Sequence, residues 1–184
     1  MVELNDIEAL FPELEENYQY LHQHPELGFE EKVTSEYIMK QLKEYGIQGK
    51  RVARTGIIAD IQGSTPGKTV AIRADMDALP IEEQSGVSYS SQNPGIMHAC
   101  GHDSHVTMLL GAAHYLAQHR DAFKGTVRLL FQPAEEGAAM EIMAAMDAEG
   151  GSSKGGAASM IAFGALDGVD ACFALHVNSL FPTG

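Results

Sequence analysis

The chain has 184 residues, 45% of them hydrophobic and 20% charged, which is an ordinary composition for one globular domain with a core. Asp and Glu number 25 against 12 Lys and Arg, giving a net charge of -13 that disfavours nucleic acid and anionic membranes as partners but not a cation. No apolar run reaches the roughly 18 residues of a membrane span. Two cysteines and an acidic N-terminus without a basic signal region lead us to expect a cytoplasmic protein without a disulfide framework.

The N-terminal part predicts two amphipathic helices. Apolar residues recur at helical spacing over residues 6–22 and again over residues 30–45. Pro25 and Gly28 interrupt the pattern between them, and Gly46 is suited to end the second helix. Beyond this helix the period of the apolar residues changes.

Two β-rich runs follow, over residues 51–61 and 68–75, and the residues between them predict a hairpin-type turn. Within the second run, Val70-Ala71-Ile72 is fully apolar, as expected of a strand buried on both faces. Residues 78–97 carry prolines and glycines and predict a loop.

The remaining segments alternate helix and strand. We expect a long helix ending near His119, a buried strand over 125–132, short helices over 140–146 and 159–166, and a strand over 170–177. Cys172, in the last strand, is expected in the core. This order predicts an α/β fold, a mixed sheet flanked by helices.

Metal-binding and acidic side chains follow the predicted strands. Asp75 and Asp77 end one strand, Glu135 and Glu136 follow the next, and His176 ends the last. Ligands bind at the carboxyl ends of strands in open α/β sheets, so we expect these segments to converge there.

Cys100 and His102 lie just before the long helix, separated by Gly101. Thiolate and imidazole bind borderline-soft divalent metals, and a glycine with positive φ lets both side chains turn toward one point. The helix N-terminus is expected to favour a thiolate. We therefore predict that both residues are ligands, whereas His105 is expected to support the ligands or face the substrate.

Glu135 and Glu136 are adjacent carboxylates, which is costly unless each has a task. One can bind metal while the other takes a proton from water. Asp75 and Asp77 can bind metal or orient a ligand imidazole, and we favour the second role. Spacing alone makes His176 more typical of a satisfied core histidine.

Other chemistries fit less well. The chain has no GxxxxGK[ST] motif, no GxGxxG after a strand and no GxSxG elbow. A cysteine protease using Cys100 would leave Glu135 and Glu136 without a role. Structural zinc would require more cysteines than the one clustered here.

Five motifs together resemble the M20 metallopeptidase family, in its amidohydrolase branch of aminoacylases, hippurate hydrolases, auxin-conjugate hydrolases and N-acetyldiaminopimelate deacetylases. They lie at residues 24–31, 73–80, 97–105, 132–137 and 164–177. The resemblance implies a zinc-exopeptidase-like catalytic domain. It also implies metal-dependent hydrolysis of the amide bond of a small N-acyl amino acid or peptide-like substrate.

The resemblance also implies a site with two divalent ions, of zinc, manganese, cobalt or nickel, and with Glu135 as the general base. The implied metal ligands are Cys100, His102, Glu136 and His176. The residues implied to lie behind the ligands are Asp75, Asp77, Asp103 and His105.

The sequence departs from the family pattern in two ways. Residues 138–155 are read as an insertion, expected to form a surface loop or flap near the site. Residues 1–184 correspond to the N-terminal part of the catalytic domain, so we expect an incomplete C-terminal side without the lid or dimerisation domain and without a last histidine ligand.

An incomplete sheet exposes an edge and apolar faces. We therefore expect self-association into a homo-oligomer, or complementation by another chain, together with weak metal binding and little hydrolysis. A non-catalytic interaction or regulatory module that retains the fold is the alternative.

Overall fold

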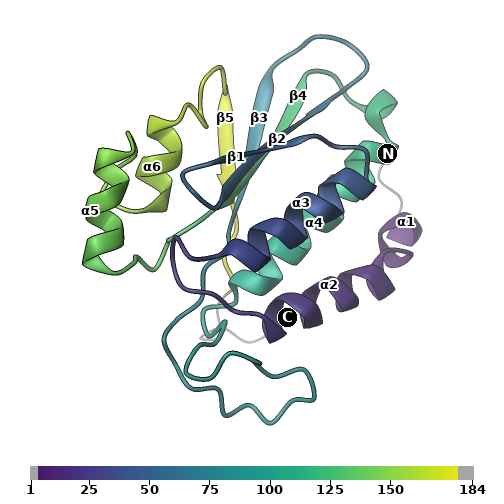
Figure 1. Cartoon of the computed structure of the whole chain (residues 1–184). Coiled ribbons are helices and arrows are strands. Elements are labelled where there is room, and N and C mark those ends of the chain that lie inside the picture. Colours follow the sequence, from purple (N-terminus) through teal and green to yellow (C-terminus); the bar gives the residue numbers. More distant parts are fainter. Residues whose placement is uncertain (1–3, 178–184) are drawn as a thin grey trace.

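The structure, a computed structural model, describes residues 4–177 and is built on one mixed sheet (Figure 1). Its five strands lie in the order β1-β2-β4-β3-β5. The bounds are β1 Gly49–Val52, β2 Gly56–Gln62, β3 Thr69–Asp75, β4 Thr126–Gln132 and β5 Ala171–Ala174. Strand β2 is antiparallel to β1 and β4, whereas β3 is parallel to β4 and β5. The predicted mixed α/β sheet is confirmed.

Helices cover both faces of this sheet. Helices α3 (Lys32–Glu44) and α4 (His102–Gln118) pack on one face, and α2 (Phe11–Gln23) packs outside α4. Helices α5 (Met140–Ala148) and α6 (Gly156–Ala162) lie on the other face (Figure 1). Two short helices complete the fold, α1 (Leu4–Glu8) and η1 (Arg120–Ala122).

The helix predicted over residues 6–22 is divided into α1 and α2. Pro12 lies in the first turn of α2. A proline has no backbone N–H and is tolerated in a first helical turn but not in a helix interior, so the chain starts a new helix there.

The core consists of two hydrophobic clusters, one on each face of the sheet. Leu129 and Phe131 of β4 belong to the cluster under α3 and α4, whereas Leu130 belongs to the cluster under α5 and α6. Successive side chains of a strand point to opposite faces, so this run of apolar residues supplies both clusters. The last four residues of β4, Leu129 to Gln132, are all buried, and the chain leads from them directly into the turn that carries Glu135 and Glu136.

The predicted hairpin between β2 and β3 is wrong, because β4 lies between them. The connecting loop crosses the start of β4 instead. Gly63 N donates to Gly125 O at 2.9 Å, and Gly125 N donates to Thr65 O at 2.8 Å. Pairing β3 with β4 and β5 as parallel neighbours places three strand ends together, which a β2–β3 hairpin would not allow.

Strand β5 is the edge of the sheet among the described residues, and its side chains are exposed. Phe173 is 62% exposed and Leu175, just beyond the strand, is 79% exposed. Cys172 is exposed as well, so its predicted core position is wrong. Within residues 4–177 no element packs beyond β5 to cover it.

Residues 138–155 contain helix α5 and a turn. Met146 is fully buried in the second core cluster, and Glu149 pairs with Arg54 at 2.6 Å. The segment is therefore packed on the sheet rather than extended as a free flap. Its origin as an insertion stays a prediction.

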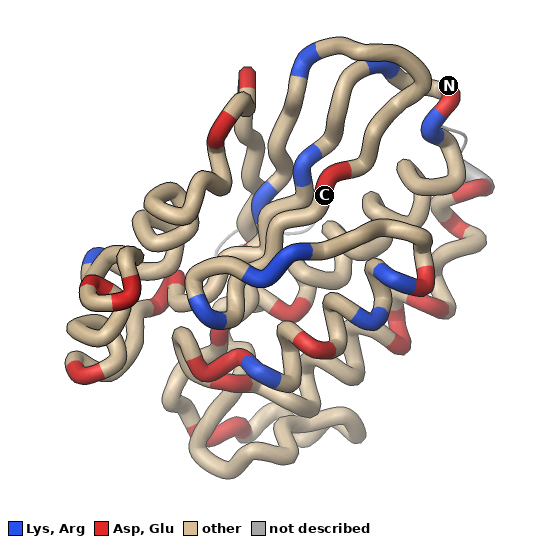
Figure 2. The backbone as a smooth tube through the Cα atoms, turned by 45° about the horizontal axis from the view of Figure 1, so that its top comes forward, with Lys and Arg blue, Asp and Glu red and all other residues tan. Residues whose placement is uncertain are grey.

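Figure 2 shows acidic residues on the helices and on several loops of the described chain. In the part of the chain that the structure describes, no helix combines the length and the apolar character needed to cross a membrane.

Candidate metal centre

The carboxyl ends of the parallel strands coincide. Asp75 of β3 pairs with Gln132 of β4, and Arg73 of β3 pairs with Ala174 of β5. The segments that carry Asp77, Glu135 and His176 therefore leave the sheet at one edge. The predicted convergence is confirmed.

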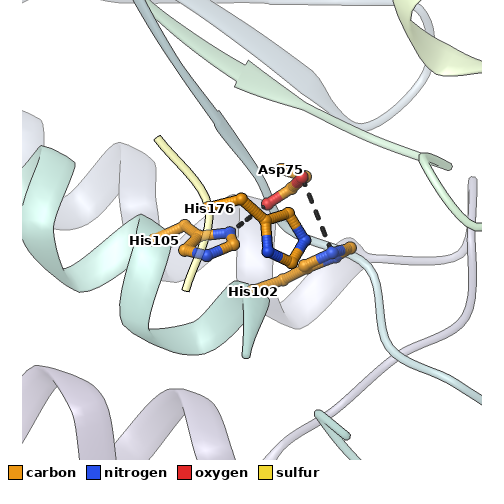
Figure 3. Close-up of side chains that lie close together, drawn as sticks. All are labelled: Asp75, His102, His105 and His176. Carbon is orange, nitrogen blue, oxygen red and sulfur yellow. Dashed lines mark hydrogen bonds and ion pairs between the residues drawn. The ribbon is translucent and has the colours of Figure 1, made fainter. Parts of the chain in front are cut away.

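Two groups of potential ligand atoms lie at this edge. Within each group, all atoms lie within 4.8 Å of one another. The first consists of Cys100, His102 and Glu136. The second consists of Asp75, His102, His105 and His176, which point toward one another in Figure 3. His102 belongs to both groups and links them.

His102 is fully buried and is held through one ring nitrogen. Its Nδ1 lies 2.9 Å from the backbone oxygen of Asp77 and 3.2 Å from its Oδ1, so Nδ1–H donates to Asp77. Its Nε2 makes no hydrogen bond within the described residues, but it lies at ion-pair distance from Asp75 Oδ2, 3.5 Å away (Figure 3), and 4.0 Å from Glu135 Oε2 and from Glu136 Oε1. A metal-ligating histidine normally donates its other nitrogen in this way, and a buried nitrogen without a partner is costly. His102 therefore fits a divalent cation.

Gly101 allows Cys100 and His102 to face the same point. Its φ is +85°, and α4 begins at the next residue. A methyl group on Gly101 would lie 2.5 Å from Val177 Cγ2. Both the positive φ and the close contact require glycine here, as the sequence predicted.

Cys100 does not show the expected thiolate preference. Burial, and next a hydrogen bond to the Glu136 carboxylate, raise the pKa of the Cys100 thiol to about 11. Burial and the neighbouring carboxylates thus favour the neutral thiol in the absence of a cation, in contrast to the expected thiolate. A coordinated metal reverses this balance, because its charge deprotonates a bound thiol.

The turn that carries Glu135 and Glu136 is held tightly. Ala134 has φ +44°, a left-handed conformation that non-glycine residues rarely adopt. Glu136 N donates to Asp77 Oδ2 at 2.8 Å. Because Asp77 also holds His102, one carboxylate positions both candidate ligands.

His105 and Asp75 support the segment that carries His176. His105 Nδ1 lies 2.6 Å from Asp75 Oδ1, and its Nε2 accepts a hydrogen bond from Val177 N at 2.9 Å. Both ring nitrogens are thus occupied. His176 Nε2 lies 3.5 Å from Cys100 Sγ. This geometry agrees with supporting roles for Asp75 and His105.

Asp103 is buried, and its Oδ2 lies 2.6 Å from His22 Nδ1 of α2. His22 Nε2 lies 3.1 Å from Glu83 Oε1 of the 78–97 loop. The carboxylate of Asp103 therefore connects α4 to α2 and to that loop through His22. Sequence reasoning missed His22, and the supporting role of Asp103 stays a prediction.

Glu31 was also missed. It is fully buried, and its Oε1 accepts a hydrogen bond from Ala134 N at 2.8 Å, next to Glu135. The only signal in the sequence was its place in the motif at residues 24–31, to which no role was given.

The donors at the sheet edge are sulfur, imidazole nitrogen and carboxylate oxygen, a set suited to zinc and its neighbours. We expect Cys100→Ala to remove the thiolate-to-metal absorption of the cobalt(II)-loaded chain. We also expect it to lower cobalt affinity by more than about 10-fold, because changing even the partners of ligands costs about 10- to 100-fold. Absorption spectroscopy during a cobalt titration measures both effects. Cys172→Ala, which removes the exposed thiol, is the matched control and should change neither.

The site thus combines a thiol and an imidazole at the start of α4 with carboxylates at the carboxyl ends of β3 and β4, on a mixed α/β sheet. The profile of the family described as Peptidase family M20/M25/M40 matches residues 71–183, and the chain belongs to this family.

The chain is also similar in sequence to individual relatives of this family. The chain is 50% identical over 159 residues to N-acetyl-L-cysteine deacetylase of Bacillus subtilis, covering 86% of this chain and 34% of the relative. It is 42% identical over 182 residues to thermostable carboxypeptidase 2 of Saccharolobus solfataricus, covering 98% and 43%. The crystal structure of a B. subtilis protein described as a dinuclear metal binding peptidase of the M20 family matches with a TM-score of 0.79 and 41% identity, covering 93% and 44%. The chain thus spans less than half the length of these relatives.

Proposed function

We propose that this chain forms the metal-binding part of an enzyme that hydrolyses the amide bond of N-acyl amino acids. The group formed by Cys100, His102 and Glu136, in which the Nε2 of buried His102 makes no hydrogen bond within the described residues, is the observation that carries the proposal. We assign Cys100, His102, Glu136 and His176 as ligands of two divalent ions in the complete site. The dinuclear description of the solved B. subtilis relative supports this number.

When bound, such ions polarise the amide carbonyl and make water easier to deprotonate. Glu135, with Oε2 4.0 Å from His102 Nε2 and its side chain 40% exposed, is placed beside the ligands yet open to substrate and water. It takes the proton of the attacking water and passes it to the leaving nitrogen. Asp77 and the Asp75–His105 pair keep His102, Glu136 and the segment of His176 in place.

The names of the relatives indicate the substrate class. A deacetylase of N-acetylcysteine and a carboxypeptidase both release an amino acid with a free carboxylate from an amide bond. We propose the N-acyl amino acid as substrate, with a peptide as the second candidate. We further propose a cytoplasmic enzyme that binds neither nucleic acid nor membranes, in keeping with its strongly acidic composition.

A chimaera tests this function, because we propose that residues 1–184 alone have little activity. It joins this chain to the C-terminal part of the B. subtilis deacetylase that lies beyond the matched region. We expect metal-dependent hydrolysis of N-acetyl amino acids. A chimaera that folds and binds metal but releases no amino acid from any N-acyl substrate would contradict the proposal.

We also propose self-association through the exposed edge at β5. Phe173 and Leu175 line a largely apolar hollow of about 480 Å³ together with Met108 of α4. Removing such apolar surface from water is favourable, at about 25 cal/mol per Å². We expect Phe173→Asp combined with Leu175→Asp to shift the purified chain toward the monomer in sedimentation velocity. An unchanged distribution would place the contact elsewhere, and a monomeric wild-type chain would disprove self-association.

A non-catalytic interaction or regulatory module is the alternative function. It predicts a folded chain that binds no metal, whereas the proposed enzyme requires metal. The metal content of protein purified without chelators separates the two.

A further inference from the structure

The segment Gly28–Glu31 is packed directly against the turn that carries Glu135 and Glu136. A methyl group on Gly28 would lie 1.9 Å from the carbonyl oxygen of Gly137 and 2.9 Å from Ala134 Cα. Glycine is therefore required at position 28 to let the two backbones approach this closely. Two members of the motif at residues 24–31, Gly28 and Glu31, thus contact the turn although they are about a hundred residues away in the sequence.

Glu31 reaches the turn with its side chain. One carboxylate oxygen accepts the hydrogen bond from Ala134 N at 2.8 Å, and the other accepts a hydrogen bond from the Thr55 hydroxyl. Ala134 is the residue with φ +44°, and such a conformation persists only where its surroundings hold it. Without Glu31, the buried N–H of Ala134 would lose its partner.

We propose that Glu31 is a positioning residue that holds the Ala134 turn, and with it Glu135 and Glu136, in the orientation needed for metal binding and proton transfer. The inference rests on the proposed function for the roles of Glu135 and Glu136. The hydrogen bond that it concerns is independent of that function. Asp77 holds the same turn through Glu136 N, so two buried carboxylates accept hydrogen bonds from its backbone.

Conservative and disruptive variants separate positioning from simple stabilisation. Glu31→Gln keeps an oxygen for Ala134 N and can donate to Thr55, whereas Glu31→Ala removes both contacts. Glu26→Ala is the matched control, because the Glu26 carboxylate accepts hydrogen bonds from Lys32 N, Val33 N and Thr34 N at the start of α3 and makes no such bond to the turn.

Cobalt(II) affinity and amide exchange of the purified 184-residue chain provide the test. We expect Glu31→Ala to lower cobalt affinity about 10- to 100-fold. Its Ala134 amide should also lose protection from hydrogen exchange as measured by NMR. Glu31→Gln should stay close to wild type in both, and Glu26→Ala should lower the unfolding temperature while keeping cobalt affinity and Ala134 protection.

Wild-type affinity and protection in Glu31→Ala would overturn the inference, as would an equal loss of affinity in Glu26→Ala. If Glu31→Ala does not fold, Gly28→Ala is expected to show the same loss of cobalt affinity and Ala134 protection, because its methyl group displaces the same turn. Wild-type affinity and protection in Gly28→Ala would also overturn the inference. If wild type binds no cobalt, the proposed function fails, while Ala134 protection in the Glu31 variants still decides whether Glu31 holds the turn.

Discussion

Glu135→Gln is expected to lower kcat of the chimaera by roughly 100- to 10,000-fold, the usual contribution of a general base. Metal affinity should remain at the wild-type level, because Glu135 is not a member of the close group of Cys100, His102 and Glu136. Initial rates of amino acid release and a parallel cobalt titration measure the two quantities.

Glu136→Gln is the informative counterpart, because it changes the adjacent residue in the same turn. It should weaken metal binding as well as hydrolysis, since Glu136 lies in the ligand group. Glu141→Gln, on the exposed side of α5, controls for the loss of one negative charge. Full activity in Glu135→Gln would show that another group takes the proton, and the reverse pattern in the two variants would exchange their assigned roles.

Stability of the wild-type chain is expected to fall with rising pH because of Glu31. Burial raises the pKa of Glu31 to about 7 from an ordinary value of 4.5, so the folded state binds more protons than the unfolded state between these values. Stability from this group is therefore present below about pH 4.5 and is lost as the pH rises through about 7. Each pKa unit corresponds to about 1.4 kcal/mol, so the loss between about pH 5 and pH 8 amounts to roughly 2–3 kcal/mol.

Glu31→Gln removes this titration and isolates its effect. The free energy of unfolding of the variant, relative to wild type, should increase by that amount between about pH 5 and pH 8 when both are measured by urea denaturation. Glu30→Gln, at the exposed neighbouring position, should show no comparable trend. A wild-type to variant difference that is constant with pH, or that changes in the opposite direction, would contradict the assignment.

The sequence allowed the sheet edge to be predicted because its signals are local. Polar residues appear abruptly after buried strands at Asp75 and Glu135, and parallel strands must place those ends together. Gly101 between Cys100 and His102 indicated a positive φ, and the structure has it. Buried strands and closely spaced ligand residues can be recognised within a few positions of the sequence, without knowledge of distant partners.

The failures concern partners that are distant in the sequence. The hairpin prediction failed because β4, more than fifty residues later, pairs between β2 and β3. Cys172 was assigned to the core from its apolar neighbours, but β5 lies at the edge of the described sheet. Glu31 was overlooked because its partner, Ala134 N, is a backbone group on another motif.

Electrostatics at Cys100 could not be predicted from its place before a helix. The position favours a thiolate, but burial and the charges of Glu136, Glu135 and Asp75, which lie on other segments of the chain, raise the pKa of the thiol. Only the assembled site shows these three carboxylates beside the thiol.

Metal binding by the purified 184-residue chain tests the central claim most directly. Zinc titrated into chelator-free protein by isothermal calorimetry, with folding checked by circular dichroism, should show saturable binding of at least one ion per chain. Cys100→Ala and His102→Ala should weaken that binding strongly, whereas Cys172→Ala should leave it unchanged. A folded wild-type chain without saturable binding, or one whose binding survives loss of both Cys100 and His102, would contradict the assignment of this sheet edge as a metal centre.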